Sequence, residues 1–125
     1  MGGGNDPKGF ERRRFPVGEV IIQQGEMGRR AYLVEEGAVE VSRGYGEKRK
    51  VLGRVGPGGI FGEMALLDGT TRMADVTAVS DTLCVVIPGE ILQEKLEKTD
   101  PFIRALIRIM ARNVRNLTEV LVEKD

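Results

Sequence analysis

The sequence predicts a mainly β domain that ends in helices, and two patterns support this prediction. Glycine recurs every few residues between Phe15 and Gly89, and short apolar runs separate these glycines. Short strands joined by glycine turns at this spacing are typical of an antiparallel barrel, roll or sandwich. After Gly89 there is no further glycine, and apolar residues recur with the period of a helix. The 125 residues suffice for one domain, which at this size buries roughly two-thirds of its unfolded surface without needing a disulfide or a metal.

The predicted β part covers about 11–88, after an N-terminal stretch, 1–10, that we expect to be flexible. Its strands are the apolar runs between the glycines. In one of them Val39 and Val41 alternate with polar residues, as in a half-buried strand. The segment Gly44–Glu47 is typical of a hairpin tip. The predicted strands, in chain order, are Val20–Ile22, Ala31–Val34, Ala38–Val41, Lys50–Val55, Asp75–Val79 and Thr82–Ile87.

The helical part covers about 89–123 and divides into two predicted helices. The first is Glu90–Lys98. The second starts at Pro101, with Asp100 as its N-cap, and continues to about Glu123 without glycine or proline. Its apolar residues form a heptad-like stripe with spacings of 4, 3, 4, 3 and 4, namely Ile103, Ile107, Met110, Val114, Leu117 and Leu121.

The apolar stripe of the second helix has two interpretations. The helix packs on its own β part, or it pairs with the same helix of a second copy, which gives a homodimer through 101–123. Phe102, Leu106 and Ile109 widen the stripe beyond a coiled-coil seam. We therefore favour the homodimer, although one helix can serve both purposes.

Composition excludes several classes of function. The 19 basic residues balance the 19 acidic ones, so the basic excess typical of a nucleic-acid-binding domain is missing. The chain has no histidine, so it contains no Ser-His or Cys-His pair for nucleophilic catalysis and no histidine-containing zinc site. We therefore expect a protein that is not an enzyme, with no catalytic residues, no metal and no cofactor.

Targeting signals are also missing from the sequence. The N-terminal residues lack the apolar core of a signal peptide, and no apolar run is long enough to span a bilayer. The single cysteine, Cys84, cannot form an internal disulfide, which fits a reducing compartment. We expect a cytoplasmic protein without a membrane segment.

One segment, Gly56–Val76, combines features that suit a phosphate and a sugar. A glycine-rich turn leads into a predicted helical turn at Glu63–Leu67, whose unpaired backbone N–H groups attract an anion. Gly62 has no Cβ, so a ligand can approach its backbone closely. The guanidinium of Arg72 suits phosphate oxygens, and the carboxylate of Glu63 suits a sugar hydroxyl. A nucleotide carries both groups, although Glu63 and Arg72 also allow a simple ion pair.

An ordered motif within this segment resembles the phosphate-binding cassette of the cyclic nucleotide-binding domain family. It reads Phe61-Gly62-Glu63-Met64-Ala65-Leu66-Leu67, followed by Arg72-Met73-Ala74, and residues 61–74 are called the cassette below. The family includes the sensor domains of catabolite activator proteins, kinase regulatory subunits and cyclic-nucleotide-gated channels. The resemblance covers about Phe15 to Leu121. It implies an eight-stranded antiparallel β-roll, similar to a jelly roll, with C-terminal helices that include one long helix.

The resemblance also implies roles for individual residues. Arg72 would pair with the cyclic phosphate, and Glu63 would accept a hydrogen bond from the ribose 2′-hydroxyl. The backbone N–H groups of Gly62, Ala65 and Met73 would complete the phosphate cradle. The implied ligand-binding set is Phe61, Gly62, Glu63, Met64, Ala65, Arg72, Met73, Ala74 and Thr118.

The same resemblance implies contacts to the C-terminal helices. Leu66 matches the residue that makes the apolar contact between the cassette and a moving helix. Leu117 and Thr118 fall near the place where related proteins cover the purine. We therefore expect the last helix to contribute to the ligand site.

Two departures from the family pattern bear on the partner and the ligand. Arg29 and Arg30 stand where members commonly carry an acidic or polar residue, a change of surface charge that would also favour an acidic partner. Met73 follows the cassette arginine at a position where cGMP-selective members often carry threonine. The sequence therefore favours cAMP over cGMP as the ligand.

Together these features predict a cyclic nucleotide sensor that rearranges its C-terminal helices on binding. Its target would be an unidentified partner protein or an attached effector domain, with no direct contact to nucleic acid. The alternative is a ligand-independent protein-interaction domain built on the same β-roll.

Overall fold

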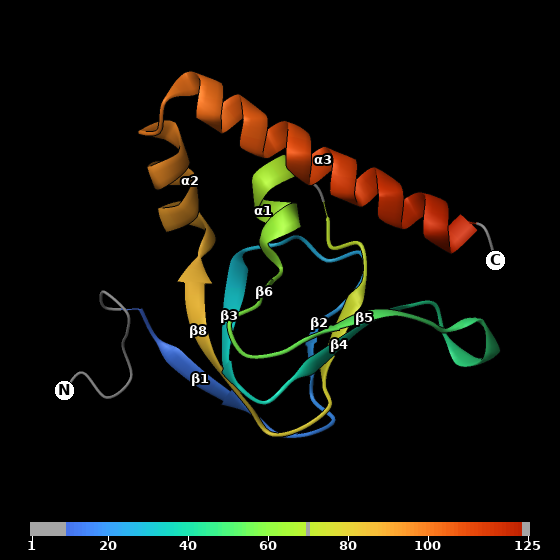
Figure 1. Ribbon diagram of the computed structural model, residues 1–125. Coiled ribbons are helices and arrows are strands. Elements are labelled where there is room, and N and C mark those ends of the chain that lie inside the picture. Colours follow the sequence, from blue (N-terminus) through green and yellow to red (C-terminus); the bar gives the residue numbers. More distant parts are fainter. Residues whose placement is uncertain (1–9, 70, 124–125) are drawn as a thin grey trace.

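Two four-stranded antiparallel sheets form the body of the molecule, and three helices lie at one end of it (Figure 1). The computed structural model describes residues 10–69 and 71–123, without the side chains of Asp68 and of residues 118–123. The fold confirms the predicted antiparallel β-roll with C-terminal helices. Of the stretch 1–10, expected to be flexible, only residue 10 falls within the described part. Within 10–69 and 71–123, no helix combines the length and apolarity needed to cross a membrane.

The first sheet has the strand order β1-β8-β3-β6. Tyr32 of β3 lies opposite Val86 of β8 on one side and opposite Phe61 of β6 on the other. Since β6 leads directly into helix α1 (Glu63–Asp68), its pairing with β3 fixes the position at which that helix begins. The strands are β1 (Arg12–Phe15), β8 (Thr82–Pro88), β3 (Arg30–Glu36) and β6 (Ile60–Phe61).

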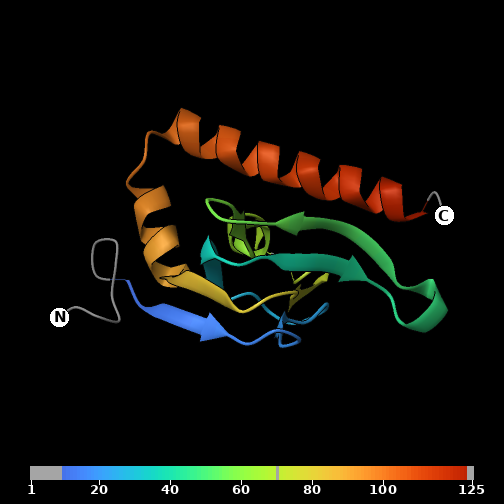
Figure 2. The same cartoon turned by 60° about the horizontal axis from the view of Figure 1, so that its bottom comes forward.

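The second sheet has the order β2-β7-β4-β5. Its strands are β2 (Val20–Ile22), β7 (Asp75–Ala78), β4 (Val39–Arg43) and β5 (Lys50–Val55). The β4–β5 hairpin projects from the body and ends in the short 3₁₀ turn η1 (Gly46–Lys48) (Figure 2). The hairpin tip predicted at Gly44–Glu47 is confirmed at this turn, where Gly44 and Gly46 both have positive φ.

The core lies between the sheets and joins apolar residues from both. The ring of Tyr32 stands edge-on to Phe15 at 5.8 Å and stacks on Phe61 at 5.0 Å, measured between ring centroids. Aromatic pairs of this kind contribute about 0.5–1.5 kcal/mol beyond the burial of their area. Burial in this core raises the pKa of the Cys84 thiol to about 11, so we expect it to be unreactive. The core cluster is Phe15, Ile22, Tyr32, Val34, Val39, Phe61, Val76, Ala78, Cys84 and Val86.

The three helices are α1 (Glu63–Asp68), α2 (Gly89–Glu97) and α3 (Pro101–Glu123), and α3 runs across α1 (Figures 1 and 2). α3 begins where the sequence predicts because Asp100 caps it. Its carboxylate accepts hydrogen bonds from the backbone N–H groups of Phe102 at 2.8 Å and Ile103 at 3.4 Å. The helix predicted at Glu90–Lys98 is confirmed to within one residue at each end.

α3 packs by one face and exposes another. Ala111 is buried and Ile107 is half-buried, so their side of the helix faces the domain. The helix therefore packs on its own domain, as the first interpretation of its apolar stripe requires. The opposite side, called the outer face below, exposes Phe102, Ile103, Leu106, Ile109, Met110, Val114 and Leu117.

Candidate functional site

Helix α1 lies between two glycines with left-handed backbone. Gly62 (φ 85°) precedes its first residue and Gly69 (φ 72°) follows its last. This conformation disfavours a side chain at both positions. At Gly62 a Cβ atom would also lie 2.9 Å from Nη1 of Arg72 and 3.2 Å from the carbonyl oxygen of Arg30. Glycine therefore allows Arg72 to approach the start of α1 closely.

Arg72 is buried at the base of the cassette, with 8% of its surface exposed. Its Nη1 donates to the carbonyl oxygen of Gly62 at 2.6 Å, and its Nη2 donates to that of Arg30 at 2.7 Å. Burial lowers the pKa of the Arg72 guanidinium below its ordinary value, and attraction to nearby groups, Tyr32 first, opposes this shift. Because arginine stays charged at neutral pH, a positive charge is fixed beside the start of α1.

Glu63 is the first residue of α1 and is half-buried beside the same cavity. The simple ion pair that the sequence also allows does not form between the described side chains of Glu63 and Arg72. Burial raises the pKa of the Glu63 carboxyl, whereas a hydrogen bond from its own backbone and attraction to Arg72 oppose the rise. A partly desolvated carboxylate of this kind gains from accepting a hydrogen bond from a ligand hydroxyl.

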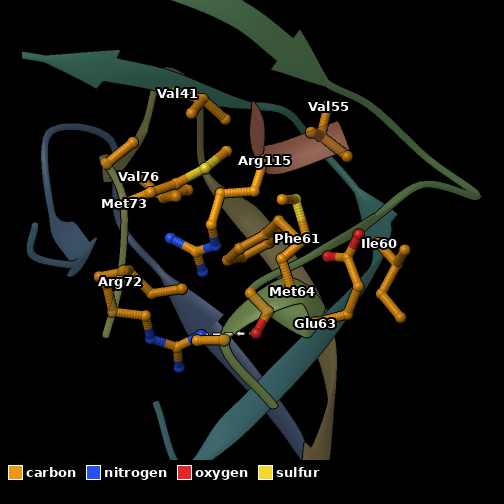
Figure 3. Close-up of a pocket in the computed structure, with 14 residues that line it drawn as sticks. Val41, Val55, Ile60, Phe61, Glu63, Met64, Arg72, Met73, Val76 and Arg115 are labelled. Carbon is orange, nitrogen blue, oxygen red and sulfur yellow. Dashed lines mark hydrogen bonds between the residues drawn. The ribbon is translucent and has the colours of Figure 1, made fainter. Parts of the chain in front are cut away.

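The cassette lines a cavity of about 170 Å³ below α3 (Figure 3). Apolar walls with a few convergent polar groups are the usual form of a small-molecule site. The remaining wall residues are mostly apolar and come from β2, β4, β5, β6 and β7, for example Val41, Val55 and Val76. The cavity brings together eight members of the implied ligand-binding set: Phe61, Gly62, Glu63, Met64, Ala65, Arg72, Met73 and Ala74.

Arg115 of α3 is a candidate functional residue that the sequence analysis missed. Its side chain reaches from α3 into the middle of the cavity (Figure 3), and its Nη2 donates to the carbonyl oxygen of Thr71 at 3.2 Å. No motif marks this position, because it depends on where α3 crosses the cavity.

Leu117, expected near the purine, does not line the cavity but lies on the outer face of α3, with 66% of its surface exposed. The side chain of Thr118 falls outside the described residues.

Leu66 is buried between α1 and the start of α2. A Cβ atom placed on Gly89, the first residue of α2, would lie 3.0 Å from Cδ2 of Leu66. The side-chain amide of Gln93 in α2 donates a hydrogen bond to the carbonyl oxygen of Leu66. Helix α1 is thus joined to α2 by a hydrogen bond and by an apolar contact.

Comparison with known proteins finds a matching family model and similar sequences. Residues 12–99 match a family model described as the cyclic nucleotide-binding domain. The cyclic AMP receptor protein of Thermus thermophilus is 36% identical over 107 residues, which cover 85% of this chain and 50% of that protein. The chain therefore spans about half the length of this relative.

Solved structures share the arrangement of the β-roll and its C-terminal helices. The catabolite activator protein of Thermus thermophilus superposes with a TM-score of 0.70 at 34% identity, over 93% of this chain and 54% of that one. The EAL enzyme Bd1971 in its cAMP-bound form gives a TM-score of 0.79 at 27% identity, over 87% of this chain and 30% of that one.

Proposed function

This chain belongs to the cyclic nucleotide-binding domain family, and on that basis we propose that it is a cyclic nucleotide sensor with cAMP as its preferred ligand. Binding in the cavity below α3 changes the arrangement of α2 and α3 and so regulates a partner protein or an attached effector domain. The proposed protein is a binding module rather than an enzyme and needs no metal or cofactor. The lack of histidine, the most frequent general base, supports the first of these points, that the protein is not an enzyme.

The placement of Arg72 and Glu63 around one cavity is the observation that carries the proposal. The guanidinium of Arg72 offers a charged fork for phosphate oxygens, and Glu63 offers an acceptor for a ribose hydroxyl. Apolar walls such as Val55 and Met73 suit the flat face of a base. A cyclic nucleotide carries all three groups. The relative described as a cyclic AMP receptor protein supports cAMP in particular. The enzyme Bd1971 supports a cyclic nucleotide without distinguishing the two, because it is solved both with cAMP and with cGMP bound.

Titration with cAMP and with cGMP, combined with thermal unfolding, tests this function. A ligand that binds only the folded protein adds about 2.7 kcal/mol to the free energy of unfolding at a hundredfold excess over its Kd. We expect a gain of this size with cAMP and a smaller gain with cGMP at the same concentration. If neither nucleotide changes the stability at millimolar concentration, the ligand-independent interaction domain becomes the better description.

The size of the cavity supports the proposed movement of α3. Its volume of about 170 Å³ is below the range of roughly 300–1,000 Å³ that is usual for small-molecule sites. Arg115 reaches into its middle and joins α3 to the carbonyl of Thr71. Because Arg115 lies in the middle of the cavity, we infer that Arg115 turns aside or α3 moves when a nucleotide enters. The ligand shifts this equilibrium by the difference between its affinities for the two arrangements.

Arg115 also makes cGMP a second candidate ligand. A guanidinium can donate to both N7 and O6 of guanine, whereas adenine presents a donor where guanine has O6. If Arg115 contacts the base, Arg115→Ala should lower the affinity for cGMP by about 5-fold or more, because such a pair discriminates by about 1–3 kcal/mol. The affinity for cAMP should change much less. Calorimetric titration of the variant with both nucleotides tests this contact. Equal losses of affinity for cAMP and cGMP would mean that Arg115 lies near the phosphate and not near the base.

Glu63→Gln is expected to weaken ribose recognition. The wild-type protein should bind cAMP about 10-fold or more tightly than 2′-deoxy-cAMP, because a hydrogen bond to a charged group contributes about 1.5–3 kcal/mol. In the variant this ratio should fall to a few-fold, since a neutral acceptor contributes about 0.5–1.5 kcal/mol. Equal affinity of the wild-type protein for the two nucleotides would rule out the role given to Glu63.

The pKa of Glu63 predicts the stability of the same variant without nucleotide. When folding raises the pKa of a carboxyl, the folded state holds the proton more tightly than the unfolded state does. The free energy of unfolding then falls as the pH rises from the pKa of the unfolded state through that of the folded state. The pKa of Glu63 is raised from its ordinary value of 4.5, so the glutamine variant should match or exceed wild-type stability at neutral pH. Thermal unfolding should show this advantage disappearing below about pH 4.5.

The outer face of α3 supports the homodimer that the sequence favours, and we propose that this face pairs with the same face of a second copy. The seven residues that define this face are all apolar, and the exposed Asn113, which lies among them at helical spacing, is uncharged. Two arginines of α3 are engaged elsewhere, because Arg104 donates to the carbonyl of Glu97 and Arg115 enters the cavity. An apolar face without charge can meet its own copy without placing like charges together, as a two-fold interface requires.

Light scattering at micromolar concentration tests this pairing. The wild-type protein should have the mass of a dimer. Leu106→Glu with Met110→Glu should raise the dimer dissociation constant by about 100-fold or more, because burial of an unpaired charge costs several kcal/mol. Arg112→Gln, on the same helix but off the outer face, is the matched control and should remain dimeric. A wild-type protein that is monomeric under these conditions would contradict the proposal.

A further inference from the structure

Arg30, the first residue of β3, and Arg29 just before it differ from several other arginines of the β-roll in having no acidic partner. Arg12, Arg13 and Arg49 each pair with a glutamate, at 2.6, 2.9 and 2.7 Å. Among the described residues, neither Arg29 nor Arg30 forms an ion pair, and both are exposed. Neither positive charge is therefore paired directly with an acidic side chain in the part of the chain that the structure describes.

Both arginines line a hollow of about 470 Å³ on the surface, called the outer hollow below. Arg72 also lines it, whereas its acidic contribution is Glu26 alone. Three guanidinium groups against one carboxylate leave a net positive charge. A second hollow nearby, of about 660 Å³, is also lined by Arg29 and Arg30, but its lining contains two glutamates, Glu11 and Glu90, and lacks Arg72. The outer hollow is therefore the one suited to an anion.

Arg72 lines both the outer hollow and the cavity below α3. One edge of its guanidinium donates to the carbonyl of Gly62 and the other to the carbonyl of Arg30. At Gly28, just before the two arginines, a Cβ atom would lie only 3.1 Å from Cζ of Arg72. Since Arg72 is 8% exposed, its charge is little screened by solvent on either side.

We propose that the outer hollow is a second anion-binding site, which takes an oxyanion of two or more negative charges, such as a diphosphate group. Arg29 and Arg30 hold the oxyanion, because guanidinium groups form paired hydrogen bonds with phosphate oxygens. Arg72 forms the inner wall of the site. The volume of about 470 Å³ leaves room for a group larger than a single phosphate.

The second site is coupled to the first through Arg72, an inference that rests on the proposed function of the cavity. An oxyanion in the outer hollow attracts the guanidinium that would otherwise hold the cyclic phosphate, and the two anions repel each other. Occupation of the outer hollow therefore weakens nucleotide binding, and reciprocity requires the nucleotide to weaken oxyanion binding by the same factor. The carbonyl of Arg29 also accepts a hydrogen bond from the backbone N–H of Gly89 at 2.7 Å, so the site adjoins the start of α2.

Calorimetry with inorganic pyrophosphate as the probe tests the inference at constant ionic strength. The first measurement is direct binding of pyrophosphate, expected for the wild-type protein and lost in Arg29→Gln/Arg30→Gln. The second is the ratio of cAMP affinities with and without pyrophosphate. This ratio should change by about fivefold or more in the wild-type protein, the lower end of usual coupling, and stay near one in the double variant. Lys48→Gln/Arg49→Gln at the hairpin tip removes the same charge and should behave as wild type.

Two outcomes would overturn the inference. If the double variant keeps the wild-type response, pyrophosphate acts in the cavity itself by competing for Arg72. If the wild-type protein neither binds pyrophosphate at millimolar concentration nor changes its cAMP affinity, the outer hollow is not a site. Failure of the proposed function is a different result, because a protein that binds no cyclic nucleotide still gives a direct measurement with pyrophosphate.

Discussion

Replacing Arg72 by alanine is expected to lower the affinity for cAMP by about 10- to 150-fold or more. A hydrogen bond to a charged group contributes about 1.5–3 kcal/mol, and a guanidinium can donate two such bonds to one phosphate. The side chain is 8% exposed and is already held in place by the carbonyls of Gly62 and Arg30. Little ordering of the arginine is therefore needed when the phosphate binds. Calorimetric titration with cAMP measures the loss.

Further variants separate loss of recognition from loss of structure. Arg72→Ala removes the donors to two partly buried carbonyls, each of which costs up to about 1–3 kcal/mol when left without a partner, so thermal unfolding must accompany the titration. Arg72→Lys keeps the charge without the planar fork and should bind with intermediate affinity. Arg54→Ala, which removes an exposed arginine paired with Glu40, is the control. A folded Arg72→Ala protein with wild-type affinity would remove the proposed phosphate site.

Gly62→Ala is expected to destabilise the protein by about 2–5 kcal/mol and to weaken cAMP binding. The left-handed backbone at φ 85° costs a residue with a side chain about 1–2 kcal/mol. The new Cβ would lie 2.9 Å from Nη1 of Arg72, and crowding of this kind adds about 1–3 kcal/mol. The arginine can relieve the crowding only by moving from its position beside the cassette. Chemical unfolding and titration with cAMP measure the two effects.

Gly69→Ala is the matched control for this substitution. Gly69 is at the other end of α1 and also has a left-handed backbone, but a Cβ there would meet nothing within 4 Å. We expect Gly69→Ala to lower the free energy of unfolding by only about 1–2 kcal/mol, the cost of a left-handed backbone for a residue with a side chain, and to leave the affinity for cAMP unchanged. Equal losses of stability and affinity in the two variants would mean that the contact with Arg72 is unimportant.

Elements with strong local signals could be predicted from the sequence almost to the residue. β5 and α3 have the predicted bounds, since glycine turns flank the β5 region and the Asp100–Pro101 pair fixes the start of α3. These features act within a few residues of where they stand. They depend little on the rest of the fold, which is why periodicity and capping were sufficient.

β1 and β6 were missed because distant contacts make them strands. β1 (Arg12–Phe15) contains three consecutive arginines and shows no alternation of apolar and polar residues. Its charges are accepted in the sheet because Arg12 pairs with Glu35 of β3 at 2.6 Å. β6 (Ile60–Phe61) has only two residues, and its pairing with β3 defines it. Neither the ion pair of Arg12 with Glu35 nor the pairing of β6 with β3 can be recognised from the local sequence.

The residues of the candidate site also differ in whether a local motif or the packing of distant elements determines their position. Arg72 and Glu63 belong to one continuous motif, so their position at one cavity could be anticipated from the sequence. Arg115 belongs to a helix whose crossing over the cavity depends on how α3 packs on α1. The same rotation of α3 that turns Arg115 inward leaves Leu117 on the outer face. An error of one or two residues along a helix is enough to reverse such an assignment.

α3 has consequences for how the signal depends on the amount of protein. One face of this helix lies over the cavity, and the opposite face is the apolar surface proposed for a second copy. Ligand binding and self-association thus act on a single rigid element. The fraction of protein that is paired rises with the concentration of the protein. If pairing favours one position of α3, the apparent affinity for cAMP therefore varies with that concentration. The abundance of the protein would then set the cAMP level to which it responds.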